Sequence, residues 1–345
     1  MPARKIPDVD LDALLRALGA RITRGDLGRM LRCGRFTLLH PIGRGGVAQV
    51  FAAIRDGEES PAHAVKLFDP GVDAEDMLAR FEAERKLIGA VAHPCVITVV
   101  DSGLHESGVP WFAMPLVDGS AITAECDDRM LTIRSRMALV SAACEGLAAA
   151  HARGIIHRDI KPGNVIASCR GERHMVRIID FGLARALAGR GPRLTPLSTV
   201  HRMGTPDYMS PEQWSDGIAA CDARADVFSL GLLIAELAAG VIARTRRGAL
   251  AQGTTVRTPL PRRAREAPAA PCAPSEALAQ LIREDPAAAS GLARLRRMGS
   301  SDELLHAVRS RIDPLVSPML AEDPRDRPED ARAALQMIEA TRRAL

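Results

Sequence analysis

The hydrophobic pattern of this 345-residue chain changes its period along the sequence. Residues 8–22 carry apolar side chains at helical spacing, which predicts an amphipathic helix. From Arg35 onward the apolar residues run in short β-rich blocks, which predicts strands. The expected strands are 36–42, 47–54, 62–68, 96–101 and 109–115. One helical stretch, 73–91, interrupts them, so this part of the chain is predicted to form a small antiparallel sheet with one helix.

Helical periods dominate the chain after Asp118. A long Ala/Leu-rich helix is expected at 132–153, and residues 226–240 are apolar nearly all round, which is typical of a central buried helix. Two short strands near 165–167 and 176–179 are expected to bracket a connection at 168–174. Further helices are predicted at 275–284, 302–320 and 329–343. The second part of the chain is therefore predicted to be mostly α-helical.

Two segments fall outside this pattern. The helix within residues 1–34 is predicted either to dock on the folded body or to recruit a regulatory partner, and docking is favoured because amphipathic faces are usually buried. Residues 241–275 are rich in arginine, proline and alanine, which predicts a loop or disordered insert. Its basic run suggests a phosphorylated or acidic partner, although a solvated surface is the commoner outcome for such runs.

Composition narrows the function classes. The hydrophobic fraction of 47% is enough for a proper core, and the net charge of +4 is too mild to indicate nucleic-acid binding by itself. The seven cysteines are scattered without a Cys-x-x-Cys pair, so neither a zinc site nor a disulfide framework is predicted. A reducing, cytoplasmic location is expected. The longest apolar run, 227–243, is interrupted by Glu236, so no membrane span is predicted.

The strongest chemical signal lies in two short blocks. Residues 157–164 supply Asp159, Lys161 and Asn164 within six residues, and Asp180 follows Asp159 by twenty-one residues. These side chains offer a carboxylate to orient a hydroxyl, an ammonium for phosphate charge and oxygens for magnesium, all of which phosphoryl transfer needs. The chain has only four lysines, and two of them, Lys66 and Lys161, lie in this pattern. An accidental placement of both is a poor explanation, because a compact ammonium is not replaceable by an arginine fork.

In this order the motifs resemble the protein-kinase signature set. Residues 36 to about 340 are similar to the eukaryotic-like (Hanks-type) serine/threonine protein kinases of bacteria. The resemblance implies an α+β, two-lobed protein-kinase fold, with a small antiparallel β-sheet N-lobe carrying one helix and a larger, mostly α-helical C-lobe. The implied kinase domain spans 35–343, with the N-lobe at 35–117 and the C-lobe at 118–343, after the N-terminal helical extension at 1–34.

The resemblance also implies catalytic roles. Asp159 would accept or orient the substrate hydroxyl proton, and Lys161 would neutralise the transferring phosphoryl group. Asn164 and Asp180 would bind Mg²⁺, with Mn²⁺ as a substitute metal. The joint presence of these residues leaves little room for purely structural explanations such as an Asx turn at Asn164.

A nucleotide site is implied upstream of this loop. Lys66 would hold the α- and β-phosphates of ATP, and a buried lysine needs a carboxylate partner. Glu84 has the family spacing for that partner, and Glu82 is the alternative. A glycine-rich turn lies between the first two strands, where backbone amides can approach phosphate oxygens. The residues implied to contact ATP are Ile42, Gly43, Arg44, Gly45, Gly46, Val50, Ala64, Lys66, Met114, Pro115, Val117 and Ile166.

Regulation is implied for the segment between Asp180 and Glu212. Because Arg158 stands next to the predicted catalytic carboxylate, a phosphate in this segment could pair with it and order the loop. The acceptors best placed for that phosphate are Thr199, Ser198 and Thr195.

Supporting residues are implied as well. Residues 204–212 resemble the end of the kinase activation segment, with Ser210 in place of the usual alanine. Glu212 would pair with the distant Arg327. Asp226 resembles the acid that anchors the catalytic-loop backbone.

The sequence therefore predicts a serine/threonine protein kinase that transfers the γ-phosphate of Mg-ATP to proteins, including its own activation loop. Lys161 and Gly204-Thr205 imply serine/threonine rather than tyrosine specificity. The predicted partners are protein substrates and a regulatory protein acting through the N-terminal helix, with no nucleic acid. The region after Gly240 lacks the family's proline-aromatic pair, so the family's substrate docking there does not carry over.

Three other interpretations stay open at this point. The chain could be an ATP-binding pseudokinase or scaffold, although the residues needed for transfer are present. It could be a small-molecule kinase, but such enzymes generally lack the segment from Thr205 to Glu212. A DNA-binding regulator using the arginine run has no recognisable reading motif.

Overall fold

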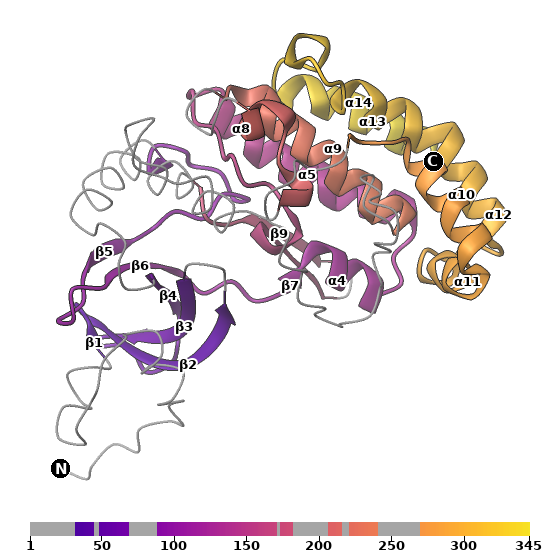
Figure 1. Ribbon diagram of the computed structural model, residues 1–345. Helices are drawn as coiled ribbons and strands as arrows, with labels where there is room; N and C mark the ends of the chain where they lie inside the picture. The colour runs from indigo at the N-terminus through magenta and orange to yellow at the C-terminus, as the bar shows by residue number, and fades with distance from the viewer. Residues whose placement is uncertain are drawn as a thin grey trace. The chain divides into compact units, whose positions relative to one another are not determined.

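The computed structural model describes residues 32–44, 48–68, 88–170, 173–181, 206–215, 221–240 and 270–345 (Figure 1). The chain divides into two compact units. Unit 1 comprises residues 1–90, 97–117 and 186–203, and unit 2 comprises residues 91–96, 118–185 and 204–345. The predicted helix at 8–22, the helix at 73–91 up to residue 87, and the insert up to residue 269 lie outside the described residues.

A six-stranded antiparallel sheet forms unit 1, with strand order β1-β2-β3-β4-β6-β5. The strands are β1 (Arg32–Cys33), β2 (Phe36–Arg44), β3 (Ala48–Arg55), β4 (His63–Phe68), β5 (Asp101–Leu104) and β6 (Pro110–Pro115). Successive side chains of a strand point to opposite faces, and one face supplies a buried cluster that includes Phe36, Phe51, Leu67 and Trp111. The short strand β1 lies ahead of the first strand expected from the sequence, 36–42.

The strand predicted at 96–101 was wrong in its position. β5 begins at Asp101, where its pairing with Ala113 of β6 starts. The valine-rich run before it has high β-propensity, but propensity forms a strand only where a neighbouring strand is available to pair. Val96 instead makes an isolated parallel bridge with Ile178, within unit 2.

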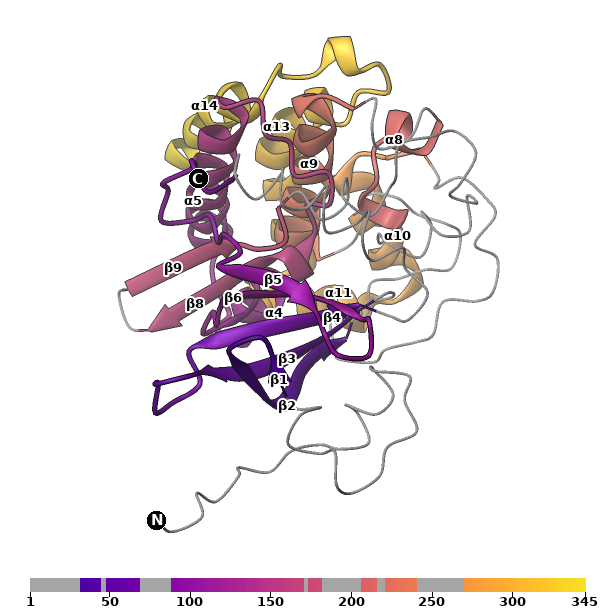
Figure 2. The ribbon, with the colours of Figure 1, turned by 90° about the vertical axis from the view of Figure 1, so that its left-hand side faces the viewer.

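Unit 2 is mostly helical and carries a three-stranded sheet. Its helices are α4 (Ile122–Asp128), α5 (Ile133–His151), α8 (Pro211–Ser215), α9 (Ala223–Ala239), α10 (Pro274–Glu284), α11 (Pro286–Leu295), α12 (Ser301–Ala307), α13 (Asp313–Met319) and α14 (Ala331–Ala344). The strands are β7 (Ser120–Ala121), β8 (Val165–Arg170) and β9 (Arg173–Ile178). The 3₁₀ turns among the described residues are η1 (Pro162–Asn164), η2 (Pro206–Tyr208) and η5 (Pro324–Asp326). Helix α9 packs against α5, α10, α13 and α14 (Figure 2).

The central buried helix predicted at 226–240 is confirmed as α9. Asp222 caps its N-terminus by accepting a hydrogen bond from Arg224 N at 2.8 Å. Gly240 ends it with a φ of 79°, and a Cβ there would lie 2.5 Å from Leu292 Cδ2. Only glycine fits this left-handed position against the neighbouring helix.

The strands predicted near 165–167 and 176–179 exist but are longer. Ser168 pairs with Met175 and Cys169 with His174, so most of the expected connection belongs to the ladder. The polar residues in this stretch favoured a loop prediction. An antiparallel hairpin needs only two connecting residues, however, and a strand with a solvated face tolerates polar side chains.

The helix predicted at 302–320 is interrupted. Residues Val308–Ile312 form a π-helical turn between α12 and α13. Pro314 has no N–H for the carbonyl of Ser310 and its ring crowds the preceding turn, so a wider turn is the expected response. Helix α11 was missed, although Asp285 caps it and Pro286 stands at its first position, which is a common helix start.

All seven cysteines lie among the described residues and none is in a disulfide; Cys272 is half-buried and the other six are buried. Within the described part of the chain, no helix combines the length and apolar character needed to cross a bilayer.

Candidate active site

The predicted catalytic carboxylate lies in the loop between α5 and β8. Lys161 Nζ is 2.6 Å from Asp159 Oδ2, and Asn164 Nδ2 donates to the same oxygen at 2.9 Å and to the Asp159 carbonyl at 2.8 Å. The side chains of Asp159 and Lys161 are 23% and 20% exposed, so both are accessible to a substrate. The turn η1, which starts with Pro162, brings the lysine and the asparagine back onto the aspartate.

Asp226 of α9 anchors the backbone of this loop, as predicted. Its carboxylate is fully buried and accepts hydrogen bonds from His157 N and Arg158 N, each at 2.7 Å, and from His151 Nε2 at 2.8 Å. These two amides hold Arg158 at a φ of 67°, a strained conformation for a non-glycine residue. Burial pushes the pKa of Asp226 up, but the hydrogen bonds from the His151 side chain and the His157 amide counter it, and the pKa lies below its ordinary value.

His151 is a supporting residue that the sequence analysis missed. Its Nδ1 accepts from Ala331 N at 3.1 Å, so the proton of the neutral ring lies on Nε2, which donates it to Asp226. Helix α14 is thereby connected to the catalytic loop through one imidazole ring. The sequence signal was a histidine in the last turn of a predicted helix, which is too common to single out.

Replacing Asp226 by asparagine is expected to lower the free energy of unfolding by about 3–5 kcal/mol, because an amide NH₂ would face buried donors. Urea denaturation followed by circular dichroism measures the change. The matched control is Asp222→Asn at the start of the same helix, where asparagine caps as well as aspartate and the change stays within ~0.5 kcal/mol. Equal midpoints for the two variants would contradict the anchoring role.

The stretch ending in Asp180 and Phe181 is fastened to the same loop. His157 Nδ1 accepts from Asp159 N at 3.2 Å, which leaves Nε2 as the donor to the Ile179 carbonyl at 2.9 Å. Ile179 N donates to the Asn164 carbonyl at 3.0 Å, and the Phe181 ring packs edge-on against His157 at 4.5 Å. Asp180 has a φ of 67°. The structure therefore brings the predicted metal ligands onto adjoining, mutually bonded segments.

The chemistry of these side chains fits Mg²⁺. Both amide hydrogens of Asn164 are used within the loop, so its side-chain oxygen is the atom that it offers a cation. Asp180 contributes a carboxylate, and Mg²⁺ typically takes one or two protein oxygens together with phosphate oxygens and water. Among the described residues no group of three or more His, Cys, Asp or Glu side chains could hold a metal ion. A Mg²⁺ site that phosphate oxygens complete does not need three such protein ligands.

The predicted nucleotide residues of unit 1 share one face of its sheet. Val50 pairs with Lys66, and Ala64 pairs with Met114. Cross-strand partners point the same way, and residues two apart along a strand do as well, so these four side chains form one patch. The buried core cluster occupies the alternate positions on these strands. Ile42, Gly43 and Arg44 end β2 beside this patch, with Gly43 paired to Val50.

Three more predicted ATP contacts are described. Pro115 ends β6, Val117 follows it half-buried at the end of unit 1, and Ile166 lies in β8 of unit 2.

Several predicted residues lie outside the described part of the chain and stay predictions. They are Gly45 and Gly46 of the glycine-rich turn, Glu84 and Glu82, and the phosphorylation sites Thr199, Ser198 and Thr195.

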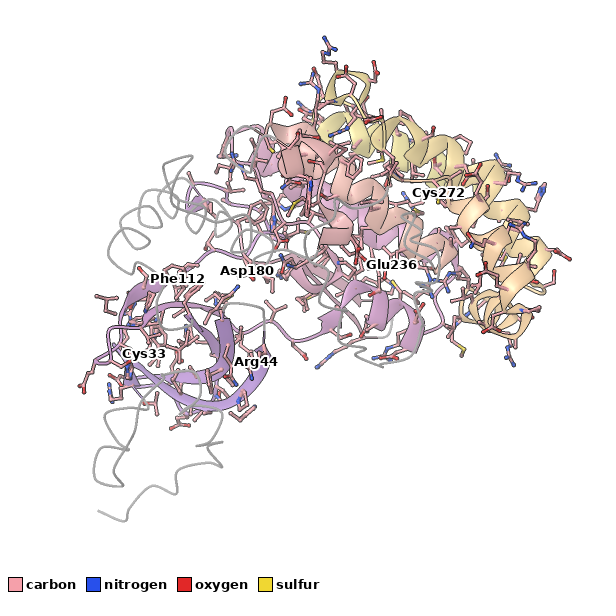
Figure 3. The ribbon with its side chains drawn as sticks, viewed as in Figure 1. Cys33, Arg44, Phe112, Asp180, Glu236 and Cys272 are labelled. Carbon is pink, nitrogen blue, oxygen red and sulfur yellow. The ribbon has the colours of Figure 1, made fainter. Side chains whose placement is uncertain are left out.

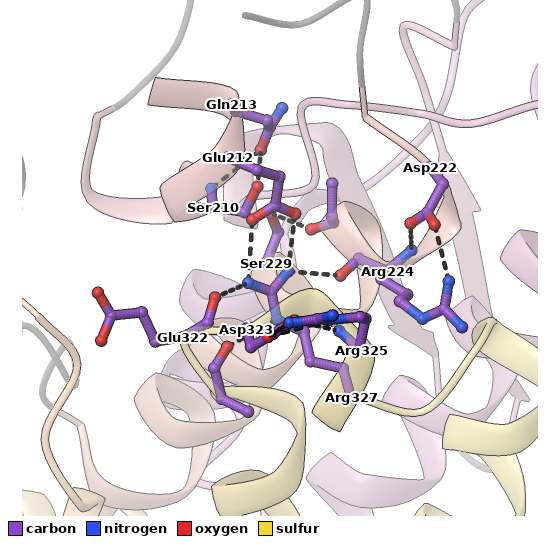
Figure 4. A network of polar contacts seen from close by, with 12 residues as sticks. Ser210, Glu212, Gln213, Asp222, Arg224, Ser229, Glu322, Asp323, Arg325 and Arg327 are labelled. Atoms are coloured by element: carbon purple, nitrogen blue, oxygen red, sulfur yellow. Dashed lines mark hydrogen bonds and ion pairs between the residues drawn. The ribbon is translucent and has the colours of Figure 1, made fainter. Parts of the chain in front are cut away.

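The predicted pair between Glu212 and Arg327 is confirmed (Figure 4). Two parallel bonds join Arg327 Nη1 to Glu212 Oε1 at 2.7 Å and Nη2 to Oε2 at 2.9 Å. The arginine side chain is fully buried and also donates to the carbonyls of Ala321, Arg224 and Glu322. A bidentate, buried pair of this kind fixes α8 to η5.

Ser210 and Gln213 were not predicted to act together. Ser210 N and Oγ donate to Gln213 Oε1 at 2.9 and 3.1 Å, and Gln213 Nε2 donates to the Arg158 carbonyl at 2.8 Å. The hydroxyl of the serine that replaces the family's alanine thus has a hydrogen-bond partner, and residues 206–215 are joined to the catalytic loop. No periodicity in the sequence connects position 213 with position 158, so this contact could not be predicted.

The protein kinase domain family matches residues 36–338, which is most of the chain. The chain belongs to the protein kinase family. The resemblance to bacterial Hanks-type kinases, stated above from the motifs alone, is confirmed.

Curated relatives of this kinase domain are serine/threonine kinases of bacteria. It is 35% identical to the serine/threonine-protein kinase pkn2 of Myxococcus xanthus over 213 residues, covering 60% of this chain and 24% of that protein. It is 36% identical over 213 residues to the DNA damage-responsive serine/threonine-protein kinase RqkA of Deinococcus radiodurans, covering 61% of this chain and 30% of the relative. The chain thus spans less than a third of the length of these two relatives.

A solved kinase domain shares the fold. The crystal structure of the Mycobacterium tuberculosis PknI kinase domain superposes with a TM-score of 0.57 at 23% identity, covering 89% of this chain and 96% of that one. The predicted α+β, two-lobed kinase fold is thereby confirmed.

Proposed function

We propose that this chain is a serine/threonine protein kinase that transfers the γ-phosphate of Mg-ATP to protein hydroxyls. The observation that carries the proposal is the Asp159 carboxylate, held by Lys161 and Asn164 and bonded through Asn164 to the segment that carries Asp180. An acceptor carboxylate, a cation and two oxygen ligands on adjoining segments are the parts that phosphoryl transfer requires.

Each residue of the loop has one task. Asp159 orients the attacking hydroxyl and accepts its proton, and Lys161 places positive charge beside the transferred phosphoryl group. Asn164 and Asp180 hold Mg²⁺, which supplies charge neutralisation at the phosphate oxygens when bound. Lys66 and its neighbours on the sheet of unit 1 hold the nucleotide, with Glu84 as partner of the lysine. A scaffold that only binds ATP would not require the Asp159 and Lys161 pair.

The substrates are proposed to be proteins and to include the chain itself. Residues 204–212 resemble the end of the kinase activation segment. The described residues 206–215 are bonded to the catalytic loop through Gln213, as in an enzyme that aligns a polypeptide beside Asp159. Thr199, with Ser198 and Thr195 next, is the proposed site of autophosphorylation, whose phosphate would pair with Arg158. The N-terminal helix is the proposed attachment point for a regulatory partner. A cytoplasmic location stays a prediction, in keeping with seven cysteines that form no disulfide.

The test is transfer of labelled phosphate from γ-labelled ATP with magnesium to the chain and to an added protein acceptor, followed by mapping of the modified residues. Labelled serine or threonine, with label on 195–199, supports the proposal. ATP binding without any transfer would favour a scaffold.

Replacing Asp180 by alanine is expected to weaken the magnesium site at least ~10-fold, because one of its two protein oxygen ligands is lost. Electron paramagnetic resonance with Mn²⁺ as a reporter, in the presence of a non-hydrolysable ATP analogue, measures the metal affinity. The control is Asp302→Ala, an exposed acid on α12. Unchanged Mn²⁺ affinity in Asp180→Ala would remove this residue from the proposed site.

A further inference from the structure

Glu236 lies near the C-terminal end of α9 (Figure 3). The residue is half-buried. The buried hydroxyl of Tyr208 donates a hydrogen bond to its Oε2. Ser229, two turns earlier on α9, donates from Oγ to the Tyr208 carbonyl at 2.7 Å. Helix α9 therefore binds both the side chain and the backbone of Tyr208. Tyr208 belongs to η2, the first three residues of the segment 206–215.

These residues connect Glu236 with the catalytic loop. From Tyr208 the chain runs through Ser210 to Gln213, and Gln213 donates to the carbonyl of Arg158, the residue before Asp159. Because the bonds join one rigid helix, one short segment and one loop, a change in the hold on Tyr208 reaches the catalytic loop through few intermediates.

The groups that face Glu236 come from several elements and act in both directions. Burial disfavours its charged form most strongly, and Asp127 of α4 and Asp207 of η2 add to that effect. The Tyr208 hydroxyl and Arg296, which follows α11, favour the charged form, whereas the fully buried Arg136 of α5 pairs with Asp127 at 2.6 Å. The balance raises the pKa of Glu236 to about 7.

We propose that Glu236 is a proton-sensitive positioning residue of this kinase. Its ionised carboxylate holds Tyr208, and with it residues 206–215, in the arrangement that presents a protein substrate to Asp159. Protonation of Glu236 weakens that hold. This inference rests on the proposed function, since it concerns the placement of the substrate beside the same loop.

The direction of the effect follows from hydrogen-bond strength and from linkage. A hydrogen bond from a hydroxyl to an ionised carboxylate is about twice as strong as one to a neutral acid, so the hold tightens as the pH rises. The fold favours the protonated form, because the pKa of Glu236 is raised from 4.5 to about 7. The contribution to the free energy of unfolding is therefore complete below pH ~4.5 and lost as the pH rises to about 7. At a pH above about 7, where residues 206–215 are held most tightly, the free energy of unfolding is therefore lower than in acid.

The chain offers a direct probe, since Tyr208 is its only tyrosine. Protein labelled with ¹³C at the tyrosine Cζ gives a single NMR resonance, which is followed from pH 5.5 to 8.5. The wild type is expected to show one titration step near pH 7 that is absent in Glu236→Gln. The matched control is Glu339→Gln on α14, a carboxylate bonded to Arg342, and it should keep the step. A flat wild-type curve, or a step that persists in Glu236→Gln, overturns the proposal.

Kinetics distinguish positioning from general support of the fold. The ratio kcat/KM for a protein acceptor is expected to rise ~3–10-fold between pH 6 and 8 in the wild type and to lose that rise in Glu236→Gln, with the KM for Mg-ATP unchanged. An equal rise in both proteins, or a KM for Mg-ATP that shifts with the variant, contradicts a positioning role. Absence of any transfer would overturn the proposed function, while the NMR titration would still decide whether Glu236 controls Tyr208.

Discussion

Asp159→Asn is expected to reduce phosphate transfer to protein by at least ~10³-fold while leaving ATP affinity within about twofold of the wild type. The asparagine oxygen can still accept hydrogen bonds from Lys161 and Asn164, which now contact the carboxylate at 2.6 and 2.9 Å. It cannot take up the proton of the attacking hydroxyl, and it brings no negative charge to orient that hydroxyl. The loss should therefore appear in kcat rather than in folding or nucleotide binding.

Two readouts measure this effect. Initial rates of transfer from γ-labelled ATP give kcat, and calorimetric titration with a non-hydrolysable ATP analogue gives the affinity. Asp222→Asn provides the isosteric control, because it makes the same change at an exposed cap of α9. Retention of more than ~10% of the wild-type rate by Asp159→Asn would show that this carboxylate is not the proton acceptor.

Arg136→Ala is expected to give the largest loss of stability, about 4 kcal/mol or more. The Arg136 side chain is fully buried and donates to Asp127 Oδ1 and to four carbonyls, those of Cys126, Leu131, Leu237 and Leu295. Alanine would take one donor from each of these acceptors, one of them a carboxylate, and would open a cavity where α4, α5, α9 and the end of α11 meet. These costs add to one another because the donors that are lost belong to a fully buried side chain.

The control for this prediction lies two residues away on the same helix. Arg134 is exposed, so Arg134→Ala should change the free energy of unfolding by no more than ~0.5 kcal/mol. Urea denaturation monitored by circular dichroism compares the two variants, and Arg136→Lys, which keeps the charge but not the planar fork, should fall between them. Similar midpoints for Arg136→Ala and Arg134→Ala would mean that the buried bonds contribute little.

The parts of the site that could be predicted are those encoded locally. Asp159, Lys161 and Asn164 lie within one turn-sized stretch, so their convergence follows from chain geometry, and the motif itself carries the chemistry. His151 and Gln213 support the same loop from further away in the sequence. His151 lies 8 residues before Asp159, and Gln213 lies 55 residues after Arg158, to which it bonds. Their contacts depend on how α5, α9 and α14 pack, and no spacing in the sequence encodes that.

The elements of the fold also divide into those that the local sequence encodes and those that depend on packing. Helix α9 was predictable because burial on all sides leaves an apolar stretch with few interruptions. The position of β5 was not, since the run before Asp101 has the propensity of a strand, but its first residue, Val96, bridges Ile178 and the ladder with β6 begins only at Asp101. The π turn at 308–312 depends on one proline, whose missing N–H acts four residues upstream and leaves the helical periodicity of the sequence nearly intact.

The composition of α9 has a consequence for attempts to make the domain more robust. Its polar residues are few, and Asp226, Ser229 and Glu236 each hold part of the catalytic loop or of the segment around Tyr208. An apolar replacement at Glu236 would remove a carboxylate whose charged form the surroundings disfavour, and selection for thermal tolerance alone would tend to accept it. Selection on heat resistance without a parallel assay of turnover would therefore be expected to enrich rigid, inactive proteins, because tolerance and activity make opposite demands on the same helix.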